Sequence, residues 1–197
     1  NNSMLQHIFE PLIRRDANQK LSPGLAVSWR AIDDLTWEFK LRKNVRWHDG
    51  SPFTADDVVF TLKRVPNVPN SPSSFATFTK PIVDVKVVDP HTLVFKTASQ
   101  HVLLPSDLAS IMIVSKLHGE KAATEDYNSG KAAIGTGPYK FVSWTPKDQL
   151  VLDRFDGYWG GTEPWQRVLR KEIPNDTARV AQLKAERDEW RANFEKF

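Results

Sequence analysis

Strand-like segments that occur in pairs, each pair joined by a short turn, constrain this fold more than any other feature. Residues 36–41 alternate between apolar and polar side chains, which is typical of a half-buried strand. Residues 83–87 and 93–95 flank one short turn, and residues 139–144 and 150–155 flank a second. Strands joined so closely pair antiparallel, because a parallel pair needs a long crossover. The pattern predicts a mixed α+β (α/β) chain and not a regular doubly wound βαβ domain.

Helical periodicity is found in three segments of the chain. Residues 3–12 place apolar side chains on one face, and residues 55–65 and the segment from 176 onward do the same. Thr54 precedes the second segment and is expected to cap it by accepting a hydrogen bond from the amide of Asp57. A helix is therefore predicted at each of these three places.

Composition narrows the class of protein. The 197 residues carry 27 Lys and Arg against 24 Asp and Glu. These charges are interspersed and do not form the basic stripe typical of a nucleic-acid binder, so we expect no nucleic-acid partner. The absence of cysteine excludes disulfides, thiol catalysis and zinc–thiolate sites.

No apolar run is long enough to span a membrane. The densest run, residues 111–114, predicts a buried strand and is far shorter than the roughly 18–20 residues of a membrane span. A further strand is expected over residues 168–173. The chain begins Asn1-Asn2-Ser3 without the features of an export signal, so any signal sequence is expected to lie outside this chain.

No arrangement of side chains points to catalysis or to a metal centre. The five histidines lie far apart, with no HExxH pair on one helical face. His48-Asp49, followed by Gly50, is interpreted as a polar turn that closes a strand, because glycine tolerates positive φ. The glycines at 135 and 137 precede a predicted strand, whereas a phosphate-binding loop needs a helix there. We expect no catalytic residue, no metal ligand, no cofactor and no enzymatic activity.

Aromatic residues are the remaining distinctive feature. The chain has seven tryptophans, and several aromatic side chains stand beside glycine or proline, as in Tyr158–Gly161 and Pro164-Trp165. Aromatic side chains on flexible loops can stack on a ligand, and they can equally pack in a core. The sequence leaves both interpretations open.

A series of short motifs, taken in chain order, resembles one known family. The motifs are Phe9–Leu12, Leu21–Trp29, Trp37–Arg42, Trp47–Val58, Gly135–Tyr139, Tyr158–Gly161 and Ile173–Pro174 with Ala178–Arg179. Over residues 8–185 the chain resembles the oligopeptide/dipeptide/nickel-type extracytoplasmic solute-binding proteins of ABC importers, bacterial solute-binding protein family 5.

The resemblance implies the first-lobe portion of a periplasmic-binding-protein-like (type II) fold. Members of the family are more than twice as long and close two lobes on the ligand. Residues 1–185 are expected to form the N-terminal lobe portion, with a subdomain inserted at about 42–167. Residues 186–197 depart from the family pattern and are expected to form a charged C-terminal helix. The chain is then either a truncation or lacks residues near Ala185.

The implied function is capture of a peptide or similar small solute in the periplasm and its delivery to the permease subunits of an ABC importer. The alternative is a truncated interaction module that kept the lobe fold without ligand capture or transport. The candidate ligand-binding residues lie on loops, and each has a structural alternative: Ser73, Ser74, Phe75, Thr136 and Tyr139. The cargo stays open among peptides, nickel complexes, haem and sugars.

Self-association is expected because an isolated lobe exposes apolar surface and strand edges. The expected seam contains residues 36–41 and the loops with Tyr158, Trp159 and Trp165. The final helix, residues 176–197, is expected to cover this seam with Trp190, Phe194 and Phe197, the alternative being a frayed, solvated tail.

Overall fold

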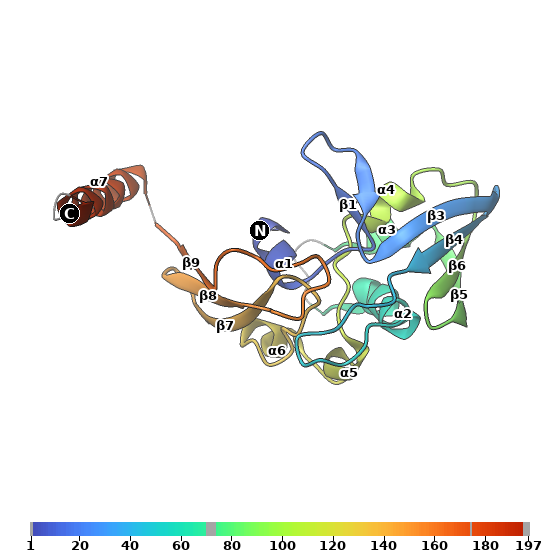
Figure 1. The fold of residues 1–197 in the computed structure, drawn as a ribbon. Coiled ribbons are helices and arrows are strands. Elements are labelled where there is room, and N and C mark those ends of the chain that lie inside the picture. Colours follow the sequence, from blue (N-terminus) through green and yellow to red (C-terminus); the bar gives the residue numbers. More distant parts are fainter. Residues whose placement is uncertain (1, 70–73, 174, 195–197) are drawn as a thin grey trace.

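The computed structural model describes residues 2–69, 74–173 and 175–194 (Figure 1). Helices and strands alternate irregularly along the chain, and the mixed α/β class is confirmed. The helices are α1 Asn2–Ile8, α2 Ala55–Arg64, the 3-10 turn η1 Val65–Asn67, α3 Ala76–Thr79, α4 Leu104–Leu108, α5 Lys116–Gly119, α6 Thr124–Asn128 and α7 Asp176–Phe194. The strands are β1 Ile13–Arg15, β2 Leu21–Pro23, β3 Ala26–Asp33, β4 Thr36–Leu41, β5 Ile82–Asp89, β6 Thr92–Thr97, β7 Tyr139–Thr145, β8 Gln149–Arg154 and β9 Arg167–Lys171.

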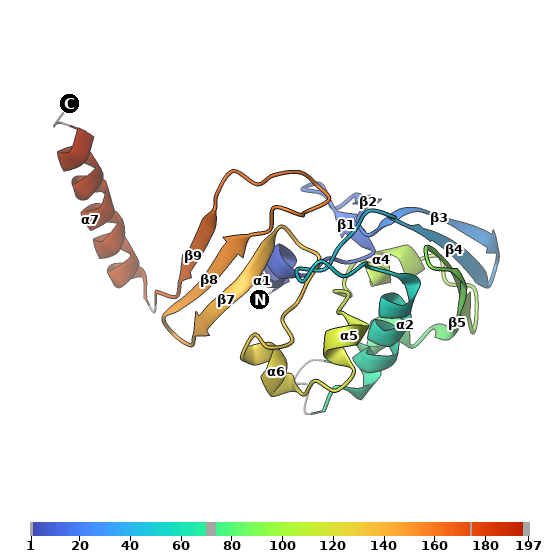
Figure 2. The same cartoon turned by 60° about the horizontal axis from the view of Figure 1, so that its bottom comes forward.

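The larger sheet is antiparallel, with strand order β3-β4-β6-β5. Its inner face is covered by α2, as Figure 2 shows, and the main core lies between them. Phe39 on β4 lies opposite Leu93 of β6, and Phe95 of β6 lies opposite Trp37. The rings of Phe39 and Phe95 meet diagonally, with centroids 4.8 Å apart, and both side chains are fully buried. The alternation of residues 36–41 therefore predicted this strand and its buried face correctly.

The start of α2 is fixed by the buried carboxylate of Asp57. Thr54, in extended conformation at the N-cap, donates its amide to Asp57 Oδ2 at 2.9 Å, and the amide of Lys116 donates to Oδ1 at 2.9 Å. Burial raises the pKa of Asp57, and these amides act in the opposite direction. The predicted helix and its N-terminus are confirmed. The expected side-chain cap is not found in the described part of the chain, because the amide of Asp57 donates to the backbone carbonyl oxygen of Thr54 at 3.1 Å. The Asp57 carboxylate also attaches α5 to α2.

The smaller sheet has the order β7-β8-β9 and carries α1 on one face. A second apolar cluster, containing Ile8, Phe9, Tyr139 and Leu152, lies between them. The turn between β7 and β8 places Lys147 at φ 64°. Strands β7 and β8 pair antiparallel, which confirms the second predicted hairpin.

Two sequence-based expectations around Pro11 were wrong. Helix α1 ends at Ile8 instead of Leu12, because a residue that precedes proline, here Glu10, avoids the helical region. Residues 111–114 do not form a strand, and only a single bridge joins Met112 to Pro11. Proline has no amide hydrogen, so pairing does not extend along it. Ile111 and Ile113 are nevertheless buried, as expected.

The expected seam was also placed wrongly at residues 36–41. Strand β4 is paired on both sides, with β3 and with β6, so it has no free edge. Helix α7 starts at Asp176 as predicted and runs without a break past residue 186, away from the sheets in both views (Figures 1 and 2). The expected docking through Trp190, Phe194 and Phe197 concerns side chains outside the described part of the chain. Within the described residues, no helix is both long and apolar enough to cross a bilayer.

Candidate functional site

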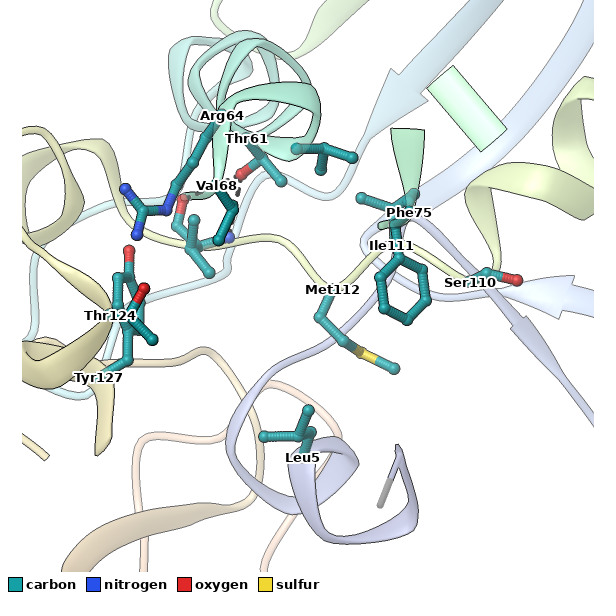
Figure 3. A pocket seen from close by; sticks show the side chains of 12 residues that line it. Leu5, Thr61, Arg64, Val68, Phe75, Ser110, Ile111, Met112, Thr124 and Tyr127 are labelled. Atoms are coloured by element: carbon teal, nitrogen blue, oxygen red, sulfur yellow. Dashed lines mark hydrogen bonds between the residues drawn. The ribbon is translucent and has the colours of Figure 1, made fainter. Parts of the chain in front are cut away.

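A mostly apolar cavity of about 310 Å³ lies between α1, the C-terminal end of α2, α6 and the segment 110–114 (Figure 3). Concave apolar sites with a few polar groups are the usual form of small-molecule sites. The lining residues are Leu5, Thr61, Arg64, Val65, Val68, Phe75, Ser110, Ile111, Met112, Val114, Thr124 and Tyr127. Phe75, Ser110 and Met112 lie on one side in Figure 3, and Arg64, Thr124 and Tyr127 lie on the other.

One wall of the cavity is held by the hydroxyl of Thr61. Thr61 Oγ1 accepts a hydrogen bond from the amide of Val114 at 3.0 Å and donates to the carbonyl oxygen of Asp57 at 2.8 Å. The hydroxyl therefore ties the segment 110–114 to α2 with its hydrogen-bonding capacity satisfied. The buried side chains of Ile111 and Ile113 anchor the same segment in the core.

The opposite wall combines a cation with an aromatic ring. The guanidinium of Arg64 lies 4.8 Å from the ring centroid of Tyr127, and Arg64 Nη1 donates to the carbonyl oxygen of Ala122 at 3.2 Å. The Tyr127 hydroxyl is buried close to Gly119, where a Cβ would lie 2.7 Å from it, and burial raises the pKa of this phenol. The ring of Tyr127 thus packs against the guanidinium of Arg64, and the side chain of Arg64 lines the cavity.

The predicted loop residues after the proline-rich stretch are placed in part at this cavity. Phe75 lines it, with its ring 5.9 Å from that of Phe78. Ser74 is exposed, and its Oγ accepts from the amide of Ala76 at 3.2 Å. Ser73 lies outside the described residues. Their role in ligand binding stays a prediction.

The other predicted residues, Thr136 and Tyr139, lie beneath α1 and do not line this cavity. Both are buried, and the ring of Tyr139 meets that of His7 edge-on at 5.9 Å. Gly137 donates its amide to the carbonyl oxygen of Ile8 at 2.9 Å. The structure therefore separates the five predicted residues into two places, and the role of Thr136 and Tyr139 also stays a prediction.

His48 connects the turn at residues 47–50 to the loop at residues 135–137. The amide of Gly135 donates to His48 Nδ1 at 3.2 Å, and His48 Nε2 lies 3.0 Å from the carbonyl oxygen of Gly137. Nδ1 accepts, so Nε2 carries the proton and donates. Burial lowers the pKa of His48 to about 4, which keeps the ring neutral. Gly50 has φ 88°, and the interpretation of this segment as a polar turn is confirmed.

The buried carboxylate of Glu10 connects the segment after α1 to the aromatic residues Tyr158 and Trp159. Only 1% of Glu10 is exposed. Trp159 Nε1 donates to Glu10 Oε2 at 2.9 Å, and the Tyr158 hydroxyl lies 3.2 Å from Oε1. Arg14 contacts both Glu10 and the Tyr158 hydroxyl, and Arg42 lies over the Trp159 ring at 3.8 Å. Tyr158 and Trp159 therefore have packing and hydrogen-bonding roles here.

Several lining residues were missed by reasoning from the sequence. Leu5, Arg64, Met112 and Tyr127 come from four separate segments of the chain. Each fits an ordinary helix or core pattern on its own, so no local pattern marks it as part of a site. Among the described residues no group of three or more His, Cys, Asp or Glu side chains could hold a metal ion. The expectation that the chain has no metal ligand stays a prediction.

Comparison with known proteins places the chain in one family. The model of the bacterial extracellular solute-binding proteins, family 5 Middle, matches residues 20–190. The periplasmic oligopeptide-binding protein OppA of Escherichia coli is 32% identical over 177 residues, which cover 79% of this chain and 32% of OppA.

Solved structures agree with this match. The oligopeptide-binding protein AppA of Bacillus subtilis, in complex with a nonapeptide, has a TM-score of 0.83 at 27% identity, covering 94% of this chain and 38% of AppA. NikZ of Campylobacter jejuni, in complex with Ni(L-His), has a TM-score of 0.82 at 28% identity, covering 92% of this chain and 37% of NikZ. The chain thus spans about a third of the length of the relatives it matches. It belongs to the bacterial extracellular solute-binding proteins of family 5.

Proposed function

We propose that this chain is the first-lobe portion of the extracytoplasmic solute-binding component of an ABC importer. In this proposal it captures a peptide or similar small solute, which the importer's permease subunits receive. One observation carries the proposal: an apolar cavity with a cation on one wall occurs on a fold shared with AppA and NikZ, which hold a nonapeptide and Ni(L-His).

The chemistry of the cavity favours a solute with both an apolar part and a negative or carbonyl oxygen. Phe75, Ile111 and Met112 provide apolar contact, and dispersion and burial favour an aliphatic or aromatic side chain there. A guanidinium presents five N–H donors, and in the described residues the Ala122 carbonyl accepts from Nη1 of Arg64. Arg64 is therefore suited to a cargo carboxylate or carbonyl.

The length of the chain limits how tightly it holds this cargo alone. Good small-molecule sites enclose about 70–90% of the ligand surface. A chain that spans about a third of its relatives provides one side of such a site. We expect weak peptide binding, because each 1.4 kcal/mol of lost contact weakens affinity about tenfold.

In the same proposal the chain has no catalytic role and acts in an extracytoplasmic compartment. Relatives named for substrate binding support the first part, and the family's extracellular description supports the second. The proposed candidate ligand contacts are Phe75 and Arg64, together with the earlier candidates Ser73, Ser74, Thr136 and Tyr139.

A peptide titration tests the proposal. Short peptides with a leucine or phenylalanine side chain are titrated by calorimetry into the wild-type chain, Phe75→Ala and Trp165→Ala. Trp165 is 69% exposed and lies outside the cavity, so it is a matched aromatic control. We expect weak wild-type binding that Phe75→Ala reduces about tenfold and Trp165→Ala leaves unchanged. Binding that both variants weaken equally, or neither weakens, contradicts the assignment of this cavity.

A further inference from the structure

Strand β5 ends the larger sheet with a free edge. It pairs with β6 on one side, and within the described residues no strand pairs with its other side. Three valines along it are exposed, Val83 by 59%, Val87 by 39% and Val88 by 55%. An exposed edge of this kind offers unpaired backbone N–H and C=O groups to another strand.

The side chains of β5 are complementary to a second copy of the same strand. In an antiparallel pair related by a two-fold axis at Val85, Asp84 of each copy lies opposite Lys86 of the other. The same axis places Val83 opposite Val87. In the described part of the chain neither Asp84 nor Lys86 takes part in an ion pair. Lys96 of β6 stands opposite Asp84 without forming one, and Lys86 stands opposite Val94.

The other edge strands of the two larger sheets lack this complementarity. Strand β3 has Arg30 near its middle and no acidic residue from 26 to 32. A two-fold pairing of β9 about Leu169 places Arg167 opposite Lys171, which is a like-charge pair. Strand β7 holds Lys140 and no acidic residue. Of these four edge strands, β5 is the one that carries opposite charges at positions related by a two-fold axis.

A groove beside β5 adds apolar surface for an incoming strand. It has a volume of about 590 Å³ and lies between β5 and the helices α2 and α3. Val59 and Leu62 of α2 and Ile82 and Val85 of β5 contribute to its lining. A strand that pairs with β5 places every second side chain toward this face of the sheet.

We propose that β5 is the surface through which two copies of this chain associate, as an antiparallel strand pair about a two-fold axis at Val85. The two sheets then form one continuous eight-stranded sheet, with two Asp84–Lys86 pairs across the junction. Eight residues a side are fewer than the roughly 20–30 of a standard stable interface. The association is therefore weak and depends on concentration.

Sedimentation equilibrium over a series of concentrations tests the charge pairing. Wild type is expected to show a monomer–dimer equilibrium. Lys86→Asp places two acidic side chains opposite each other at both pairs and is expected to weaken association about tenfold or more. The double variant Asp84→Lys/Lys86→Asp restores opposite charges and most of the association. Lys121→Asp makes the same charge change on an exposed loop and leaves association unchanged. A wild type that stays monomeric, or a double variant that associates no better than Lys86→Asp, overturns the proposal.

Cysteine cross-linking tests the register even where a charge variant lowers stability. The chain has no cysteine, so V85C introduces a single thiol on the proposed axis. Directly opposed residues of an antiparallel pair have Cα atoms about 4.5–5.5 Å apart, within the range that a disulfide spans. V85C is expected to form a covalent dimer on mild oxidation, whereas V142C, on the exposed edge strand β7, does not. Equal cross-linking of both variants, or none at V85C, contradicts the two-fold register.

Discussion

The cavity and the polar contacts around Glu10 and His48 are built in opposite ways. The cavity is lined mainly by apolar side chains, with Arg64 as its cation. The second region holds hydrogen bonds from the buried carboxylate of Glu10 and the partly buried ring of His48. Apolar walls adapt to different guests, whereas a buried polar network fixes one geometry. The predicted residues are divided in the same way. Phe75 lines the adaptable cavity, whereas Thr136 and Tyr139 are buried near α1, where the geometry is fixed.

The largest effect is expected from the buried carboxylate. Glu10→Ala removes the acceptor of Trp159 Nε1 and the partner of Arg14. Removing one member of a buried pair costs about 3–5 kcal/mol, and we expect the lower value because Arg14 is partly exposed. Denaturant unfolding of Glu10→Ala measures this loss. Asp156→Asn is the control, since Asp156 pairs with Arg154 while 78% exposed and its loss is expected to matter little. A comparable loss in both variants contradicts the importance of burial here.

The next effect is a dependence of stability on pH that arises from His48. Its pKa is about 4 in the folded chain and about 6.5 in the unfolded one. The unfolded state therefore binds the proton first, so stability is complete above pH 6.5 and falls as the pH drops toward 4. The shift corresponds to roughly 3 kcal/mol.

His48→Gln isolates this contribution because glutamine does not ionise. The free energy of unfolding is measured between pH 4 and 7 for both chains. The variant is expected to be less stable at pH 7 and to lose less stability on acidification. Parallel curves for the two chains are incompatible with a neutral, partly buried His48.

A smaller effect is expected at the start of α2. Thr54→Ala removes a side chain that makes no capping hydrogen bond among the described residues, and it leaves the amide that donates to Asp57. The expected loss is smaller than the roughly 1 kcal/mol of a side-chain cap. The denaturation midpoint of Thr54→Ala measures it, and a loss of the full capping energy contradicts this geometry.

The smallest effect on stability is expected at Thr136, where a substitution also tests whether this buried residue takes part in ligand binding. Among the described residues the buried Thr136 Oγ1 has no hydrogen-bond partner. Thr136→Val removes this hydroxyl with little change in shape and is expected to leave stability within about 1 kcal/mol of wild type, or to raise it. Peptide binding is measured on the same variant. Unchanged peptide binding supports a structural role for Thr136, and loss of peptide binding indicates that Thr136 contacts the ligand.

Local patterns predicted β4, the two hairpins and the start of α2, but not the cavity. The alternation of residues 36–41 and the spacing after Thr54 are local, because each side chain is placed by its neighbours in one strand or helix. The cavity needs Leu5, Arg64, Met112 and Tyr127 together, and such contacts depend on how separate elements pack. Phe75, chosen because it follows a proline-rich loop, lines the cavity, and its role in binding stays a prediction. The role of Glu10 could not, because Tyr158 and Trp159 lie almost 150 residues further along the chain.

Contacts between residues that are far apart in the sequence also affect the order in which the chain folds. The carbonyl of Ile8 is bonded by the amide of Gly137, and a Cβ at Gly135 would lie 1.7 Å from that carbonyl oxygen. Helix α1 is thus completed by a loop more than 120 residues away, and closing so long a loop carries an entropic cost before its contacts form. We expect the N-terminal helix to be among the last parts of the chain to become protected. Pulsed hydrogen exchange during refolding follows this directly, and early protection of the Phe9 amide, ahead of α2, contradicts it.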